Sequence, residues 1–550
     1  MEFKPSGETS LNSYFEDYMN YNSFYSDGQA RSAYLKSKTN LKPVSELRQI
    51  LPQIFAVLII NICSFDLGLS IGFIREMFIH TIEGKTKDFS KELVLMSSIT
   101  LITGAIGYLI SGPIVQNTGR QRVLLIVSVF RTTLWLFTIR ANKILTQMLC
   151  LGSFGLTGAL MHGPIMMYVA EISRPRIRGV LLVIFPMAVS FGILCESGFT
   201  RFEIADKKTV GLASSGCSLF SFVLLLCIPE SPHWLASTGQ IERLEQALCW
   251  LRGWVEPDAV RSEVRHLCKI FAMRGYPAGV QPTISENEEL TRDELSRIWR
   301  LYSGRSFWIP FLLSFIATIV KVFGGSCMTQ MLVPILSSEL RFPLERDLSA
   351  VVVGLLEIVV NVIGMCVIYF FGRRKLIVSS MSILTISQIT LSIYIFIMNK
   401  DSHGENFGFI GVFLMLIITS FSQLGIVLVP YLFTSEIFPI ETRGLGIGLV
   451  NATSLVIILF SIKIFIYLMS HIGDSTTHLC FAVMNIVGCI ILYFNLPETD
   501  GKSLIEIKKF FADERRQQSK IQKISVGPIH HVDLCQHQAT KKNIFSRKFG

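Results

Sequence analysis

The chain has 550 residues, of which half are hydrophobic and only 17% are charged, and its formal net charge is +10. Soluble proteins normally carry about 25% charged residues, so this composition argues against a soluble enzyme. The mean hydropathy is +0.48, and the apolar residues form runs of roughly 18 to 25, enough to cross a hydrocarbon core of about 30 Å. These features predict an all-α membrane protein that crosses the bilayer many times.

The elements follow one another in five stretches. Residues 1–48 are polar and predict a cytoplasmic N-terminal tail, and 49–229 hold a first group of six apolar spans. Residues 230–304 predict a cytoplasmic loop with amphipathic helices, 305–496 hold a second group of six spans, and 497–550 predict a cytoplasmic C-terminal tail. The spans are expected near 50–73, 93–113, 121–140, 144–168, 180–199, 209–228, 308–333, 349–371, 376–398, 408–433, 445–469 and 476–496.

Within the central loop, the segment from Glu242 to Arg252 alternates charged residues with apolar ones. The apolar positions are Leu244, Ala247, Leu248 and Leu251. This spacing puts them on one face of a helix, so an amphipathic helix is predicted beneath the membrane bundle.

Basic residues gather in the short loops after the second, fourth, eighth and tenth spans. Such loops normally face the cytoplasm, so we expect a multi-pass protein with both termini cytoplasmic, in the plasma membrane. The positive charge is expected to face anionic lipid of the inner leaflet, which leaves no need for a nucleic-acid partner.

No group of residues in the chain suggests chemistry on a substrate. The 12 cysteines are scattered, mostly inside apolar spans, and form no disulfide or zinc pattern. We therefore expect no catalytic residues, no metal and no cofactor. The partners expected are a small-molecule solute and the lipid bilayer, and nothing in the sequence identifies a protein partner.

Three short phrases occur twice, in the same order, once beside each group of spans. The pairs are Gly119-Arg120-Gln121-Arg122 and Gly372-Arg373-Arg374-Lys375; Glu171 with Arg178-Gly179 and Glu436 with Arg443-Gly444; and Pro229-Glu230-Ser231 and Pro497-Glu498-Thr499. In both halves the Arg-Gly pair begins seven residues after the glutamate. Duplicated membrane halves are how many transporters build a central site that opens to alternate sides.

The phrase from Pro229 to Leu235 resembles a signature of the sugar porter branch of the major facilitator superfamily, in which an arginine usually stands where this chain has His233. Similar family phrases occur at Ala170–Ser173, Ser435–Pro439 and Leu496–Leu504. The resemblance covers about residues 50–510. It implies the major facilitator fold, with twelve transmembrane helices as two six-helix bundles, and transport by alternating access. Within the family we expect the insect facilitated trehalose transporter-like group to be nearest.

The doubled phrases place opposite charges at the expected cytoplasmic ends of the spans. In the family such charges pair between the halves while the protein faces outward. We therefore predict a cytoplasmic gate, with Glu230 and Glu498 bracing it. Its residues are Arg120, Arg122, Glu171, Arg178, Glu230, Arg373, Arg374, Glu436, Arg443 and Glu498. The alternative is that these charges only anchor helix ends and record topology.

The expected substrate path departs from the family pattern. Lys321 stands in the phrase of the seventh span where the family has a pair of glutamines, and Tyr431 stands where it has a tryptophan. Charged side chains inside a membrane usually face a cavity or a partner. We expect the solute to meet Lys321, Ser326, Tyr431, Asp66 and Glu357.

Two of these charges raise further alternatives. Lys321 and Glu357 are able to pair across the cavity, either to bind or couple the solute or only to fix helix register. Asp66 lies in a phrase similar to that of proton-coupled members, whose usual partner is an arginine in the fourth span. Residues 141–163 contain no arginine, which argues against proton coupling.

The sequence thus predicts a transporter of a small solute that is sugar-like by family. Two alternatives follow from the altered path. A lysine there favours an anionic solute over a neutral sugar, and a non-transporting nutrient sensor would keep the gate while losing the site.

Overall fold

Every regular element that the computed structural model describes is a helix. The structure describes residues 46–83, 91–141, 143–201, 207–272, 302–325, 346–400, 408–439 and 442–495. Twelve helical stretches among them are long and apolar enough to cross a membrane. The prediction of an all-α protein with twelve spans is therefore confirmed.

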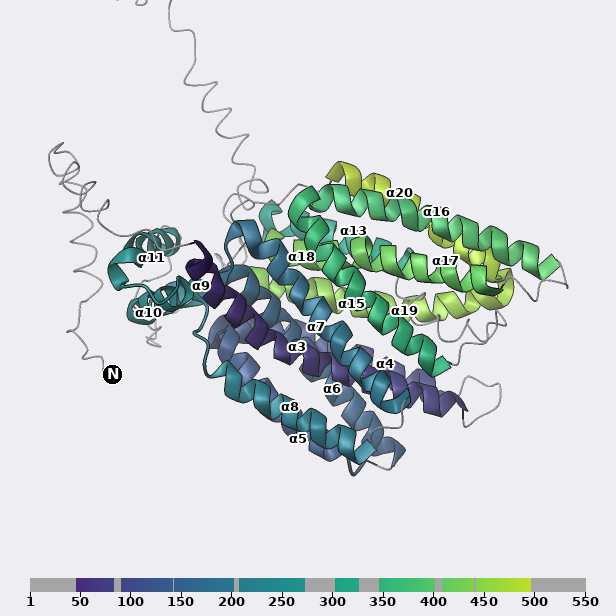
Figure 1. Cartoon of the computed structure of the whole chain (residues 1–550), viewed down its shortest axis with the longest axis horizontal. Helices are drawn as coiled ribbons and strands as arrows, with labels where there is room; N and C mark the ends of the chain where they lie inside the picture. Colours follow the sequence, from purple (N-terminus) through teal and green to yellow (C-terminus); the bar gives the residue numbers. More distant parts are fainter. Residues whose placement is uncertain are drawn as a thin grey trace, which may run out of the picture.

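The N-terminal half contains six spanning helices, drawn purple to teal in Figure 1. They are α3 (Glu46–Glu83), α4 (Lys91–Thr118), α5 (Arg120–Thr138), α6 (Ile144–Ile172), α7 (Pro175–Arg201) and α8 (Lys207–Leu225). Three shorter helices follow, α9 (Pro232–Ser237), α10 (Ile241–Leu251) and α11 (Pro257–Ala272).

The C-terminal half repeats the arrangement in green and yellow (Figure 1). Its helices are α13 (Arg305–Phe323), α15 (Arg346–Phe371), α16 (Arg373–Lys400), α17 (Gly408–Phe421), η1 (Ser422–Val427), α18 (Leu428–Ile437), α19 (Arg443–Ile472) and α20 (Asp474–Asn495). The tenth span is built from α17, α18 and the π-helical η1 between them.

Two glycines end the described part of the seventh span. Within the span predicted at 308–333, α13 ends at Phe323, because Gly324 caps it and Gly325 takes a positive φ of 82°. Residues 326–333 lie outside the described residues. Side-chain amides of Gln388 and Asn485 both donate to the carbonyl oxygen of Gly324, at 2.8 and 2.9 Å. The end of α13, which carries Lys321, is therefore fastened to α16 and α20.

Glycines let the two halves approach closely where α4 packs on α19. A Cβ at Gly112 would lie 2.8 Å from the Leu445 Cα, and one at Gly448 would lie 2.5 Å from the Tyr108 carbonyl oxygen. Membrane helices associate mainly through packing, so small residues at such crossings bring the backbones together. A second contact between the halves joins α7 to α15.

The short helices α9, α10 and α11 form a lobe at one end of the bundle (Figure 1). The lobe has a core of its own, which includes Trp234, Leu244, Leu248, Val260 and Val264. The predicted amphipathic helix at 242–252 is confirmed as α10, whose four predicted apolar residues are all buried.

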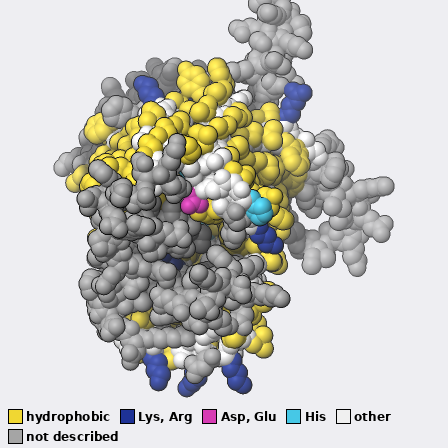
Figure 2. All heavy atoms as spheres, turned by 90° about the vertical axis from the view of Figure 1, so that its right-hand side faces the viewer, with side chains coloured by type: hydrophobic (Ala, Val, Ile, Leu, Met, Phe, Trp, Pro, Cys, Tyr) yellow, Lys and Arg dark blue, Asp and Glu magenta, His cyan; other side chains and the backbone are white. Residues whose placement is uncertain are grey.

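Much of the bundle surface is apolar. Large hydrophobic side chains such as Phe130, at 62% exposed, and Phe370, at 76%, point outward from the spans. Figure 2 views the end opposite the lobe, where hydrophobic side chains make up most of the described surface and charged ones are few. In a membrane, the side chains that point outward from the spans meet lipid.

Candidate gate and substrate site

The third spanning helix of each half begins with an arginine, because the glycine just before it ends the preceding helix. Gly119 (φ 102°) separates α4 from α5, and Gly372 (φ 76°) separates α15 from α16. Side chains other than glycine rarely adopt such angles. Arg120 and Arg373 therefore start new helices, and they are only 4% and 3% exposed.

Each of these arginines contacts a buried glutamate of its own half. Nη2 of Arg120 lies 2.9 Å from Oε1 of Glu171 near the end of α6. Nη2 of Arg373 lies 2.8 Å from Oε1 of Glu436 near the end of α18. The hydroxyl of Ser231 also donates to Glu171. Neither carboxylate side chain is exposed.

A second arginine reaches each glutamate from the opposite half. Nε of Arg178, on α7, lies 2.8 Å from Oε1 of Glu436. Nη1 of Arg443, on α19, lies 3.6 Å from Oε1 of Glu171. Each carboxylate thus holds one arginine of its own half and one of the other. We call this set the charge cluster: Arg120, Glu171, Arg178, Arg373, Glu436 and Arg443.

Glu230 braces the charge cluster through the backbone. Its carboxylate accepts the N–H groups of Arg120, Gln121 and Ser231 at 2.9 to 3.2 Å, which holds the first turn of α5. Burial raises the pKa of Glu230, although these N–H donors oppose the shift. The residue predicted as its counterpart, Glu498, lies outside the described residues.

The two remaining predicted gate residues contact aromatic rings of their own halves. The guanidinium of Arg122 lies over the Trp234 ring at 5.6 Å, and that of Arg374 lies over the Tyr493 ring at 4.8 Å. Nη2 of Arg374 also donates to the Tyr493 carbonyl at 2.6 Å. Among the contacts described here, neither arginine takes part in the ion pairs that join the two halves.

His233 lies in the electrostatic field of the charge cluster, next to Glu171, Arg120 and Arg443. Burial lowers its pKa to about 4, so the imidazole is neutral near pH 7. A neutral ring adds no positive charge to a cluster that already holds four arginines.

Near the middle of the bundle, aromatic side chains of both halves meet. The Tyr108 hydroxyl lies 2.9 Å from Nδ1 of His162. The His162 ring packs on Phe185 at 4.8 Å and on Tyr431 of the other half at 5.6 Å. Nζ of Lys321 lies 4.6 Å from the centre of the Tyr431 ring and 3.5 Å from its hydroxyl. We call these five residues the central cluster.

His162 has the position and the chemistry of a ligand-binding residue. It lies ten residues before the end of α6, or about 15 Å at 1.5 Å per residue, close to half the hydrocarbon thickness. The residue is 4% exposed, and its Nε2 atom has no hydrogen-bond partner among the described residues. Buried polar atoms normally have partners, so a solute hydroxyl would complete the site.

The structure places Lys321 and Glu357 against different residues. Lys321 contacts Tyr431, as the predicted path requires, whereas Oε2 of Glu357 accepts a hydrogen bond from the Ser190 hydroxyl at 3.0 Å. Ser190 lies on α7 and Glu357 on α15, so this bond joins the halves. Ser326, the other residue predicted on the seventh span, lies outside the described residues.

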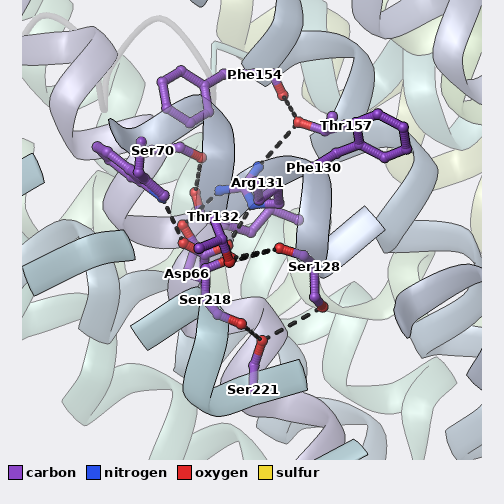
Figure 3. A network of polar contacts seen from close by, with 12 residues as sticks. Asp66, Ser70, Ser128, Phe130, Arg131, Thr132, Phe154, Thr157, Ser218 and Ser221 are labelled. Atoms are coloured by element: carbon purple, nitrogen blue, oxygen red, sulfur yellow. Dashed lines mark hydrogen bonds and ion pairs between the residues drawn. The ribbon is translucent and has the colours of Figure 1, made fainter. Parts of the chain in front are cut away.

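Asp66, which the sequence predicts to meet the solute, is held by residues of its own half. It is 0% exposed inside the N-terminal half, where Nε of Arg131 donates to one carboxylate oxygen (Figure 3). Nε1 of Trp135 donates to the other at 2.8 Å. Arg131 also donates to the Asp66 carbonyl at 2.9 Å, and Ser218 donates to the carboxylate at 3.4 Å.

The arginine partner of Asp66 therefore exists, but it comes from the third span instead of the fourth. Arg131 is fully buried, and its Nη1 also reaches the Thr157 hydroxyl on α6 at 3.3 Å. The sequence argument rested on the absence of an arginine from residues 141–163, which does not bear on the third span. Which span supplies the guanidinium depends on how α5 is rotated, and no local pattern records that.

Sequence reasoning also missed Tyr108, His162 and Phe185. His162 carried a usable signal, since it is a histidine inside an apolar span, and intramembrane ionisable residues are candidate functional sites. Tyr108 and Phe185 carried none, because apolar spans contain many aromatic residues and only the fold brings these two to His162.

Two duplicated six-helix halves around a buried polar and aromatic cluster place the chain among the polytopic membrane transporters with the major facilitator fold. The chain belongs to the family described as "Sugar (and other) transporter", whose model matches residues 56–511.

Several characterised proteins are similar over most of their length. The facilitated trehalose transporter Tret1 of Apis mellifera ligustica is 23% identical over 482 residues, or 87% of this chain and 91% of that protein. Tret1 of Polypedilum vanderplanki is 23% identical over 90% of this chain and 94% of that protein. The structure of the proton:xylose symporter XylE bound to 6-bromo-6-deoxy-D-glucose superposes with a TM-score of 0.67, at 18% identity, over 84% of this chain and 99% of that one.

The protein is therefore a multi-pass membrane transporter of a small, sugar-like solute and not an enzyme. The family assignment favours this function over the two alternatives, an anion carrier and a non-transporting sensor.

Proposed function

We propose that the protein carries its solute by alternating access and that the charge cluster is the gate at the lobe end. The pairing in the charge cluster supports a gate, because each glutamate contacts one arginine of its own half and one of the other half. When the halves separate at this end, only the contacts Arg178–Glu436 and Arg443–Glu171 must break. Each glutamate keeps an arginine of its own half, so opening leaves no buried carboxylate without a partner.

This arrangement lowers the cost of opening. Removing one partner of a buried ion pair costs about 3–5 kcal/mol because the other charge is stranded. Here Arg120 and Arg373 contact their glutamates within their own halves, so separating the halves does not require these pairs to break. The crossed arginines bias the equilibrium toward the closed gate without locking it.

The central cluster is the proposed binding site. A sugar carries apolar C–H faces that pack on aromatic rings and hydroxyls that need hydrogen bonds. Phe185 and Tyr431 offer rings, and Tyr108, His162 and Lys321 offer polar atoms. Ser326 and Glu357 remain proposed contributors.

We propose that transport is facilitated diffusion. The carboxylate of Asp66 is satisfied by Arg131, Trp135 and Ser218 within one half. A carboxylate held by three donors in a single half has no contact that changes when the halves move, so it is poorly placed to couple protons to transport.

The substrate is tested by uptake of labelled solutes into proteoliposomes without a proton gradient. The panel holds trehalose, glucose, xylose and a sugar acid. We expect uptake of a neutral sugar, and we expect Lys321→Gln to retain it. Uptake of the sugar acid alone, lost in Lys321→Gln, would favour the anion carrier. If the folded protein takes up none of the four solutes, the sensor is favoured.

The site is tested by His162→Phe. A hydrogen bond contributes about 0.5–1.5 kcal/mol, so the KM for the transported sugar is expected to rise about two- to tenfold. The matched control is His478→Phe, since His478 is equally buried but packs against Phe481 in α20, away from the central cluster. Equal effects of the two variants would contradict the proposed site.

We propose further that the lobe faces the cytoplasm, with both chain termini on that side, in the plasma membrane. The basic residues at the lobe end support this orientation. An epitope tag at the C-terminus should bind antibody in permeabilised cells only, and binding to intact cells would reverse the orientation.

A further inference from the structure

The turn between α10 and α11 carries an unusual residue. Trp254 is the one non-glycine residue with positive φ among the described residues, at 54°. Its side chain is also 56% exposed. The left-handed region is unfavourable for a bulky residue, and such outliers persist where the surroundings or a function require them. Glycine would avoid both the backbone strain and the exposed ring.

The turn is packed onto the beginning of the first span. A Cβ at Gly253 (φ 99°) would lie 2.6 Å from the Arg48 carbonyl oxygen, so only glycine allows this approach. The Trp254 ring lies 5.9 Å from the Trp250 ring, which in turn lies 6.4 Å from Phe55 of α3. The indole of Trp254 is thus fixed beside the first turns of α3.

Those first turns enter the membrane. The candidate span begins at Leu47, and α3 presents Leu51, Phe55 and Leu58 outward at 52%, 46% and 50% exposure. The aromatic side chains of Phe55, Trp250 and Trp254 therefore continue the lipid-facing surface of α3 onto the lobe.

The chemistry of this edge suits the boundary between headgroups and hydrocarbon. Tryptophan is enriched there because its ring is apolar and its N–H is polar. Exposed Arg48 lies where long cationic side chains extend toward headgroups. A water-facing turn would have no use for a strained, exposed indole.

We propose that the turn Arg252–Trp254 places the Trp254 indole in the headgroup region of the leaflet on the lobe side and anchors the lobe to the bilayer surface. The occupant of this surface is lipid, because the surface is continuous with the membrane-facing side of α3.

The test uses the full chain in lipid nanodiscs, which expose both faces to solution. Tryptophan emission of the wild type and of Trp254→Phe is compared, and the difference reports Trp254. Quenching is measured with phosphatidylcholine brominated near the glycerol end of its acyl chains and, separately, with iodide in the water. The positive control is Trp308→Phe, since Trp308 begins a candidate span and is 54% exposed.

We expect brominated lipid to quench the Trp254 emission as it quenches that of Trp308, and iodide to have little effect. Quenching by iodide but not by brominated lipid would show an indole in water and overturn the proposal. Emission that neither agent quenches would show an indole covered by protein and would overturn it as well. If Trp254→Phe does not fold, Trp254→Gly, which relieves the left-handed backbone, gives the same difference.

Discussion

The sharpest test of the charge cluster is the substitution Arg178→Gln. It removes the 2.8 Å contact between Nε of Arg178 and Oε1 of Glu436, which joins the halves. Glu436 keeps Arg373 of its own half, so the variant strands no buried carboxylate. The lost contact joins the halves, so it exists only in the conformation in which they meet at the lobe end.

The magnitude follows from burial. Exposed ion pairs contribute about 0–1 kcal/mol, but the side chains of Arg178 and Glu436 are only 2% and 0% exposed. A hydrogen bond to a charged group then contributes about 1.5–3 kcal/mol. Since 1.4 kcal/mol is a factor of ten, a loss of about 2 kcal/mol shifts the equilibrium toward the open gate by about thirtyfold.

The assay measures the distance between the halves by pulsed electron paramagnetic resonance. Spin labels are attached at Asn117 and Lys375, which are exposed at the lobe end of opposite halves, in a background without other reactive cysteines. Arg178→Gln should increase the population with the longer distance. The control Arg374→Gln removes an arginine that contacts Tyr493 of its own half and should leave the distribution unchanged. If Arg178→Gln does not alter the distribution of distances between the labels, the gate is refuted. The charges would then only anchor helix ends.

Three further predictions concern stability and packing. Asp66→Asn strands the buried guanidinium of Arg131 and should cost about 3–5 kcal/mol of stability. We expect a lower melting temperature with an unchanged KM. A changed KM at an unchanged melting temperature would indicate that Asp66 contacts the solute. The pKa of His233 is about 4 in the folded protein against 6.5 for the free side chain, so the unfolded chain binds more protons between these values and stability should fall by at most about 3 kcal/mol as the pH drops from 6.5 to 4. In His233→Gln the melting temperature should depend less on pH over that range than in the wild type. Parallel curves of melting temperature against pH for the two proteins would contradict the reasoning. Gly448→Ala puts a methyl group 2.5 Å from a backbone carbonyl of α4 and should abolish transport, whereas Gly216→Ala, with open space around it, should behave as the wild type; equal activity of the two variants would rule out tight packing between the halves.

The spans and the lobe helix were predictable because their signals are local. An apolar run long enough to cross the bilayer is visible without knowing its neighbours, and the spacing of Leu244, Ala247, Leu248 and Leu251 identifies α10. The end of α13 has a local cause too. The apolar run continues past Phe323, but Gly324 and Gly325 end α13 with help from amides on other helices.

The charge cluster was predictable in membership but not in pairing. All six of its residues stand in the doubled phrases. The sequence does not state that Glu436 holds Arg373 and Arg178, or that Glu171 holds Arg120 and Arg443, since this depends on how the halves face each other.

The sequence by itself determined the membrane class, the twelve spans, the duplication and the family, because hydropathy and motif spacing are properties of short segments. Only the tertiary structure decided which residues meet. Successive side chains on a helix differ in direction by about 100°, so small differences in the rotation and crossing of helices decide each contact. These differences gave Asp66 its partner Arg131 and brought His162 from the N-terminal half against Tyr431 of the C-terminal half.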